Sequence, residues 1–245
     1  MESGRKVLLI DCDEQANLTK SFVDGRVPDL GIETLLDPAM EPITEGLAKP
    51  TNYSGINIIP STGKLPQVNL LDQKAWEKYD LQFSLVEPLG KLRGQYDHLL
   101  LDCPPNLSLI SFAALCAADY VLVPLEAADW GAQGIINVAA AMEYVKQRFN
   151  PKLRLLGYLV SRFKKNRAYQ QTYLSELRQK FGPDTFDTVL PDLAHFEKSV
   201  IDRIPITLHS PRSSAAAICR ELFREFEARI QRDSTSRIRI RPQHV

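Results

Sequence analysis

The sequence predicts an α/β fold with a mostly parallel, twisted sheet and helices on both faces. Short apolar runs without helical periodicity alternate with longer segments whose apolar residues recur at helical spacing. Such alternation is typical of strands and helices joined by right-handed crossovers. Two of the apolar runs end on carboxylates, as expected at the carboxyl edge of a parallel sheet. The 245 residues, 44% of them hydrophobic, are enough for one domain of this class.

The central strand is predicted within residues 96–106, Y-D-H-L-L-L-D-C-P-P-N. The run Leu99–Leu101 has no helical spacing, which predicts a strand buried on both faces. The strand ends on Asp102, because Pro104 and Pro105 cannot donate hydrogen bonds to a ladder. A carboxylate at this position lies where open α/β sheets bind ligands.

A second apolar run also ends on carboxylates. Residues 7–17 read V-L-L-I-D-C-D-E-Q-A-N, so Asp11 and Asp13 follow a predicted strand. Two strands that deliver acids to the same edge of one sheet predict a site for a cation and a phosphate. Mg²⁺ prefers one or two carboxylates, waters and phosphate oxygens to a cage made only of protein ligands.

The other elements follow from apolar spacing and turn residues. Strands are predicted at residues 56–59, 120–125, 153–160 and 186–190, with Pro124 and Pro191 ending the second and the last. Helices are predicted at residues 18–23, 31–36, 67–71, 81–92, 108–117, 132–149, 168–181 and 213–230. Pro88 predicts a kink in the 81–92 helix, and Ser108 is a predicted N-cap. These elements predict a single domain over 1–233, followed by a basic, disordered tail over 234–245.

Composition limits the possible functions. The formal net charge is zero, so any affinity for nucleic acid must come from a local patch. Four scattered cysteines with no C-x-x-C pair predict reduced thiols in a cytoplasmic protein: Cys12, Cys103, Cys116 and Cys219. No apolar run approaches the roughly 20 residues that span a bilayer. The polar N-terminus leads directly into a strand, so no signal peptide is predicted.

Three motifs in order resemble one known family. The segments V-L-L-I-D-x-D-x-Q-x-N, L-L-L-D-C-P-P and V-L-V-P-L-E resemble switch I, Walker B and the following strand of ParA-type partition ATPases, the ParA/Soj and MinD group. The resemblance covers nearly the whole chain. It implies a P-loop NTPase-like switch that uses ATP and Mg²⁺ to partition plasmid or chromosomal DNA, or to position a cargo. It also implies an ATP-sandwich homodimer, non-specific DNA binding, a ParB-like or adaptor protein as partner, and a cytoplasmic, nucleoid-associated location without membrane binding.

One part of the family pattern is missing from the 245 residues. Members carry a first strand, a K-G-G-V-G-K-T type phosphate loop and a first helix ahead of the segment that Gly4–Lys6 resembles. The Gly63-Lys64 dipeptide lies in no G-x-x-x-x-G-K-[ST] pattern. We therefore expect an N-terminally truncated version of the fold, with an open edge beside Leu99–Leu101 where the first strand would pair. The sequence does not decide whether the chain hydrolyses ATP. Two alternatives to a ParA-like switch remain. One is a binding module that lacks a P-loop and does no chemistry, and the other is a MinD-like membrane-associated ATPase.

The resemblance implies a role for each acid. Asp102 matches the Walker B acid, which contacts Mg²⁺ through a water. Asp13 matches the switch I acid that orients the attacking water, and Asp11 would stabilise the surroundings of the metal. Ser161 and Pro191 match positions near which members contact adenine. Glu14 departs from the pattern, because proline is usual there.

Two basic clusters are candidates for DNA contact. Residues 162–167 hold four cations, Arg162, Lys164, Lys165 and Arg167, between a predicted strand and a predicted helix. Cations on such a loop suit sequence-independent contact with the phosphate backbone, although many charged loops are only solvated. The tail 237–242, R-I-R-I-R-P, alternates instead of repeating at helical spacing, which argues against a membrane anchor. Cys103 lacks the cysteine pattern of the related iron–sulfur reductases, so we expect the chain to hold no iron–sulfur cluster.

Overall fold

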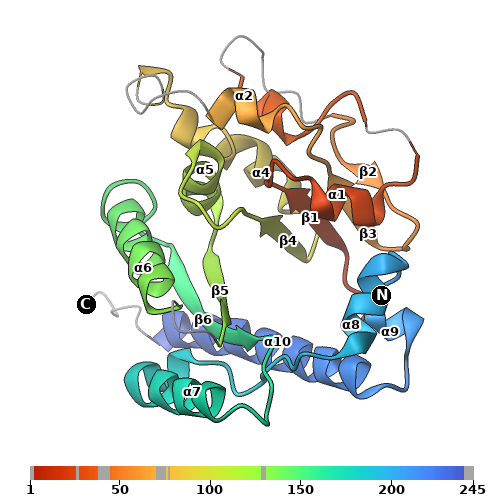
Figure 1. The fold of residues 1–245 in the computed structure, drawn as a ribbon. Coiled ribbons are helices and arrows are strands. Elements are labelled where there is room, and N and C mark those ends of the chain that lie inside the picture. The colour runs from red at the N-terminus through yellow and green to blue at the C-terminus, as the bar shows by residue number, and fades with distance from the viewer. Residues whose placement is uncertain are drawn as a thin grey trace. The chain divides into compact units, whose positions relative to one another are not determined.

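The computed structural model describes residues 3–25, 28–37, 45–69, 76, 78–127 and 131–239 (Figure 1). Over these residues the predicted α/β fold with mostly parallel strand pairing is confirmed. The chain divides into two compact units. Unit 1 comprises Met1–Asp119 and Ala141–Leu153, and unit 2 comprises Tyr120–Ala140 and Arg154–Val245.

Unit 1 has a sheet with the strand order β2-β3-β1-β4 (Figure 1). Its strands are β1 (Val7–Asp11), β2 (Lys49–Pro50), β3 (Ile56–Ile59) and β4 (His98–Asp102). β1 pairs in parallel with both β3 and β4, and β2 pairs antiparallel with β3. The β1–β4 register places Asp11 directly opposite Asp102, so both carboxylate-bearing strands end at one point of the sheet.

β4 is an edge strand of its sheet among the described residues. It pairs with β1 over its full length, and no described strand pairs with its other edge. The prediction of burial on both faces is wrong. Leu99 and Leu101 pack on the core, but Leu100 is 43% exposed. Side chains alternate between the two faces of a strand, so Leu100 shares the open face with Asp102.

The helices of unit 1 enclose one apolar core. They are α1 (Asn17–Phe22), η1 (Ile32–Leu35), α2 (Leu65–Asn69), η2 (Leu81–Phe83), α4 (Val86–Leu92) and α5 (Leu109–Ala117). The prediction of one kinked helix over 81–92 is wrong, because η2 and α4 are separate. Pro88 lies in the first turn of α4, where its missing N–H costs no helical hydrogen bond. Ser108 is the N-cap residue of α5, but its side chain accepts no capping hydrogen bond from the backbone N–H groups of the first turn.

Unit 2 has a two-stranded parallel sheet of β5 (Tyr120–Glu126) and β6 (Arg154–Ser161). Pro124 was predicted to end its strand, but β5 continues through it and Pro124 lies opposite Leu159. Proline is tolerated in this position because β5 has only one neighbour among the described strands, so its other edge needs no N–H there.

Helices pack on both faces of the β5–β6 sheet. Unit 2 contains α7 (Ala168–Phe181), η3 (Gly182–Asp184), α8 (Ala194–Ile201), α9 (Ile206–His209), α10 (Ser214–Arg239) and the first part of α6 (Gly131–Arg148). On one face, Val123 and Val160 pack with Ile135 of α6 and Leu177 of α7. On the other face, Leu156 and Leu159 pack with α10. This arrangement confirms the prediction of helices on both faces.

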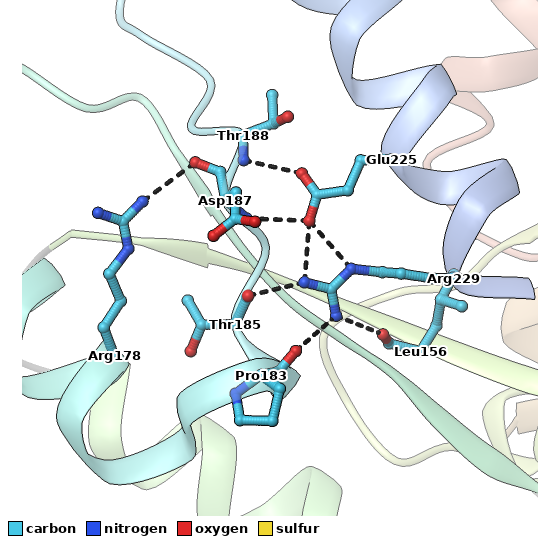
Figure 2. Close-up of polar contacts among 8 residues, drawn as sticks. All are labelled: Leu156, Arg178, Pro183, Thr185, Asp187, Thr188, Glu225 and Arg229. Atoms are coloured by element: carbon cyan, nitrogen blue, oxygen red, sulfur yellow. Dashed lines mark hydrogen bonds and ion pairs between the residues drawn. The ribbon is translucent and has the colours of Figure 1, made fainter. Parts of the chain in front are cut away.

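A segment without helix or strand, residues 185–190, lies against β6. A strand was predicted at 186–190, but only isolated bridges form, at Thr185 and Pro191. An ion pair on α10 holds this segment (Figure 2): Glu225 accepts hydrogen bonds from the N–H groups of Asp187 and Thr188, at 2.9 and 2.8 Å. Arg229 donates to the carbonyls of Leu156, Pro183 and Thr185. Because side chains of α10 use these backbone groups, the segment need not extend the sheet.

α10 is longer than predicted. The sequence predicts its end near Ile230, but the helix continues to Arg239, so it covers part of the predicted 234–245 tail. No glycine or proline occurs between Ser213 and Pro242, so nothing in the sequence interrupts the helix earlier. Residues 240–245 of that tail lie outside the described residues.

Candidate functional site

Asp11 lies at the centre of the acidic end of β1. Its side chain is completely buried, and its oxygens accept three hydrogen bonds. Oδ2 accepts from the backbone N–H and the hydroxyl of Thr19, at 2.7 and 2.6 Å, and Oδ1 accepts from the N–H of Asp13 at 3.1 Å. The Thr19 hydroxyl oxygen in turn accepts from the N–H of Ser61 at 2.9 Å. Asp11 therefore ties the 12–19 segment to the end of β3.

Asp13 stands in the turn that follows β1. Its Oδ1 accepts from the N–H of Gln15 at 3.0 Å, and its carbonyl accepts from the N–H of Ala16 at the same distance. Ala16 has a left-handed conformation, with φ of 52°, which ends the turn and starts α1. The half-exposed Asp13 carboxylate is thus held by its own turn. Glu14, which departs from the family pattern, is exposed in the same turn.

Asp102 ends β4 on the same sheet edge. Partial burial, followed by the negative charges of Asp11 and Asp13, raises the pKa of the Asp102 carboxyl. Repulsion of this kind requires the three carboxylates to lie near one another. The described residues hold no group of three or more His, Cys, Asp or Glu side chains that would cage a metal. Mg²⁺ in nucleotide sites needs only one or two carboxylates beside waters and phosphate oxygens.

The basic loop, residues 162–167, belongs to unit 2. Phe163 anchors it: its side chain is buried, its N–H donates to the carbonyl of Leu190, and its carbonyl accepts from the N–H of Asp192. Gln170 of α7 closes the loop by accepting from the N–H of Lys164 at 2.6 Å. The loop is thus held by backbone hydrogen bonds, and its charged side chains point outward.

Two of the four cations of the loop have acidic partners. Arg162 pairs with Glu126 at 3.1 Å, and Lys164 pairs with Asp192 at 2.9 Å. The hydrogen bond from Lys164 lowers the pKa of Asp192 despite some desolvation, so that acid stays charged. Lys165 and Arg167 are exposed and have no ion pair with any described residue. A cavity of about 330 Å³ lies beside the loop, lined by Glu126, Ala127, Arg162, Lys164, Arg167, Tyr169, Gln170 and Asp192.

Ser161 and Pro191, the predicted adenine neighbours, lie on adjacent segments of unit 2. Ser161 ends β6 and donates from its hydroxyl to the carbonyl of Leu125 at 3.3 Å. Pro191 forms a bridge with Phe163, two residues further along. The structure therefore brings these two positions together within unit 2, while Asp11, Asp13 and Asp102 come together within unit 1.

Comparison with known proteins identifies the family. Residues 1–155 match the sequence model of the AAA domain. The chromosome-partitioning ATPase Soj of Thermus thermophilus is 34% identical over 228 residues, which are 93% of this chain and 86% of Soj. This chain belongs to the ParA/Soj family of partitioning ATPases. The chromosome partitioning protein ParA of Caulobacter vibrioides is 28% identical over 229 residues, 92% of this chain and 84% of that protein.

Solved structures support the same fold. Apo McdA from Cyanothece is similar with a TM-score of 0.76 at 20% identity, over 94% of this chain and 88% of McdA. A protein described as cobyrinic acid a,c-diamide synthase from Mycobacterium smegmatis, with bound ATP analog and magnesium, has a TM-score of 0.67 at 26% identity. That match covers 82% of this chain and 80% of the other. Among the described residues, no helix is both long and apolar enough to cross a membrane.

For this ParA/Soj family member, sequence reasoning missed the partners that hold the site residues. Thr19 and Ser61 support Asp11, and Gln170 closes the basic loop. The ion pairs of Glu126 and Asp192 with the loop cations were also not predicted. Glu126 follows the predicted strand 120–125, and Asp192 follows the predicted strand 186–190 and Pro191. An acid at the end of each strand was therefore the sequence signal for partners of the loop cations.

Proposed function

We propose that this chain is an ATP-dependent switch for DNA partition or cargo positioning. The observation that carries the proposal is the convergence of Asp11, Asp13 and Asp102 at the ends of β1 and β4 in a ParA/Soj family member. The ATP analog and magnesium bound by the similar Mycobacterium smegmatis protein support ATP and Mg²⁺ as the cofactors.

We assign the three acids different roles. Asp102 would hold Mg²⁺ through a water, and Asp13 would orient the water that attacks the γ-phosphate. Asp11 uses its oxygens on Thr19 and Asp13, so its role toward the metal would be to position the Asp13 turn. When bound, Mg²⁺–ATP supplies the transferable phosphoryl group and neutralises its charge. Ser161 and Pro191 remain our proposed neighbours of the adenine.

The basic loop is our proposed DNA contact. Lys165 and Arg167 are exposed cations, which suit electrostatic, sequence-independent binding to phosphates. Arg162 and Lys164 would also contact phosphates once their ion pairs with Glu126 and Asp192 break. A homodimer that sandwiches ATP, a ParB-like or adaptor partner and a cytoplasmic, nucleoid-associated location complete the proposal, on the basis of the family.

The test is Mg²⁺-dependent ATP hydrolysis with and without duplex DNA. Asp13→Ala should abolish hydrolysis, while Glu14→Gln, a change of an exposed acid in the same turn, should leave it unchanged. Where the unmodified protein hydrolyses ATP, equal hydrolysis by the Asp13→Ala variant would contradict the assignment of Asp13. Assays at several protein concentrations would show whether activity requires a dimer.

A second candidate is a binding module that keeps the fold but does no chemistry. It is favoured by one observation: the 245 residues contain no G-x-x-x-x-G-K-[ST] pattern. The backbone N–H groups and the lysine of that loop make most phosphate contacts in P-loop proteins, so the 245-residue chain should bind ATP weakly or not at all. Isothermal titration with Mg²⁺–ATP tests this. An in-frame K-G-G-x-G-K-T segment in the coding DNA ahead of Met1 would favour the ATPase.

A further inference from the structure

Two of the four cysteines lie side by side at the ends of neighbouring strands. Asp11 of β1 lies opposite Asp102 of β4, so the next residues, Cys12 and Cys103, are also opposite each other. The N–H of Cys12 donates to the carbonyl of Asp102 at 2.9 Å, which continues the strand pairing to this position.

This arrangement suits a disulfide. Neighbouring strands lie about 4.7–4.9 Å apart. The Cα atoms of disulfide-bonded cysteines are usually about 4.4–6.8 Å apart. Because residues opposite each other in a parallel pair project from the same face, the bond requires no change in the pairing of β1 with β4.

The two thiols differ in their access to solvent. Cys12 is 0% exposed and belongs to the core of unit 1, whereas Cys103 is exposed. A reagent in solution can therefore reach the Cys103 thiol first. The neighbouring Cys12 thiol is then in position for a second reaction step. The other two cysteines are on helices, Cys116 buried in α5 and Cys219 half-buried in α10.

We propose that Cys12 and Cys103 form a reversible dithiol–disulfide pair that reacts with small-molecule disulfides. Sγ of Cys103 attacks one sulfur of the reagent, its S–S bond breaks, and the leaving sulfur takes the Cys103 proton as a free thiol. Sγ of Cys12 then attacks Sγ of Cys103 in the mixed disulfide, and the second reagent thiol leaves with the Cys12 proton. The protein loses two protons and two electrons, and the small disulfide takes them up and is reduced to two thiols.

The position of the pair links it to the acids. Cys12 lies between Asp11 and Asp13, and Cys103 directly follows Asp102. A bond between them joins the backbone of the two segments that carry these carboxylates, which restricts the Asp13 turn. Only this consequence for the acids rests on the proposed function; formation of the bond does not.

Peptide mapping of the oxidised protein tests the proposal. The 245-residue chain carrying Cys116→Ala and Cys219→Ala is treated with oxidised glutathione, alkylated and digested with trypsin. Cys12 then lies in peptide 7–20 and Cys103 in peptide 94–146, from which Cys116→Ala removes the competing thiol. We expect the two peptides to be cross-linked, the link to disappear on treatment with dithiothreitol, and Cys103→Ser to prevent it.

Two controls keep the outcome decisive. The unmodified chain, with all four cysteines, should give the same link between peptides 7–20 and 94–146, so the result does not depend on the folding of the variants. In urea-unfolded protein the link should form much more slowly, because the strand pairing no longer holds the thiols together. A glutathione adduct on Cys103 without the cross-link, or equal rates in folded and unfolded protein, would overturn the proposal. This measurement requires neither ATP nor DNA, so it can fail while the proposed function stands.

Discussion

Thr19 donates both its backbone N–H and its hydroxyl to the same oxygen of Asp11, at 2.7 and 2.6 Å. Asp11 is fully buried at the end of β1, and a buried carboxylate is costly unless its oxygens are hydrogen-bonded. The two hydrogen bonds from Thr19 therefore offset part of the free-energy cost of burying the Asp11 side chain. The pair also fixes the start of α1 relative to the sheet, and hence the turn that carries Asp13.

Replacing Thr19 by valine should destabilise unit 1. The change keeps the shape of the side chain but removes the donor to Asp11 and the acceptor of the Ser61 N–H. Leaving buried polar groups without partners costs about 1–3 kcal/mol. Urea unfolding should show this loss as a lower midpoint. Ser21→Ala on the same helix removes only a hydroxyl that donates to the carbonyl of Asn17, and should change the stability by less than about 0.5 kcal/mol.

Asp102→Asn should stabilise the protein at neutral pH. Partial burial and the charges of Asp11 and Asp13 raise the pKa of the Asp102 carboxyl, so its ionised form is disfavoured in the folded state. Because much of the Asp102 residue still faces solvent despite the partial burial of its carboxyl, solvent screening keeps the gain below about 1 kcal/mol. The difference in the free energy of unfolding between Asp102→Asn and the unmodified protein should vanish as the pH falls through the raised pKa. Below that pH the Asp102 carboxyl is protonated and, like the asparagine side chain, carries no charge.

The measurement is the midpoint of urea unfolding between pH 7 and pH 4. Glu14→Gln removes an exposed charge from the neighbouring turn and serves as the control, with little change expected at any of these pH values. A lower stability of Asp102→Asn at pH 7 would show that the carboxylate is held by favourable contacts, contrary to our interpretation. A gain in stability on removing an acid is typical of functional sites.

The sequence predicted the strands that carry the acids, because short apolar runs ending on Asp11 and Asp102 have few other interpretations. It did not predict the exposure of Leu100. A run of three leucines gives no alternation from which to infer that one face of β4 is open. Similarly, Pro124 was expected to end its strand, because the sequence does not show on which edge of β5 an N–H is needed.

Long-range contacts explain the other differences. The segment 186–190 has the composition of a strand, but Glu225 and Arg229, far along the chain, use the backbone groups nearby. The same limit applies to the basic loop. Four cations in six residues were visible in the sequence, but Glu126 is 36 positions away from Arg162, so its ion pair was not predictable from local spacing.

The ion pairs of the basic loop predict which cations matter most for DNA. Changing Lys165 and Arg167 together to alanine should weaken binding to duplex DNA and reduce the slope of log K against log salt by about 2, because each lost phosphate contact removes roughly 0.9. Fluorescence anisotropy between low and moderate salt measures both quantities. The variant with Lys152→Ala and Lys198→Ala removes the same charge elsewhere and is the matched control. Equal slopes for the two variants would mean that the loop is only solvated surface.

The contacts of Glu225 predict how stability depends on pH. Burial opposes ionisation of this carboxyl, but hydrogen bonds from Thr188, Asp187 and Arg229 outweigh it and lower its pKa (Figure 2). A lowered pKa means that the stabilisation is complete above the unfolded value, about 4.3 for glutamate, and is lost as the pH falls through the folded value. Glu225→Gln should therefore be less stable than the unmodified protein at pH 7, by about 1–3 kcal/mol. The difference should shrink below pH values of about 4, where the unmodified protein also loses the charge.

Urea unfolding from pH 7 to pH 3 measures this difference. Glu221→Gln, an exposed position one turn earlier on α10, is the control. A constant difference across this range would mean that the shape of the side chain, and not its charge, holds the 185–190 segment to α10.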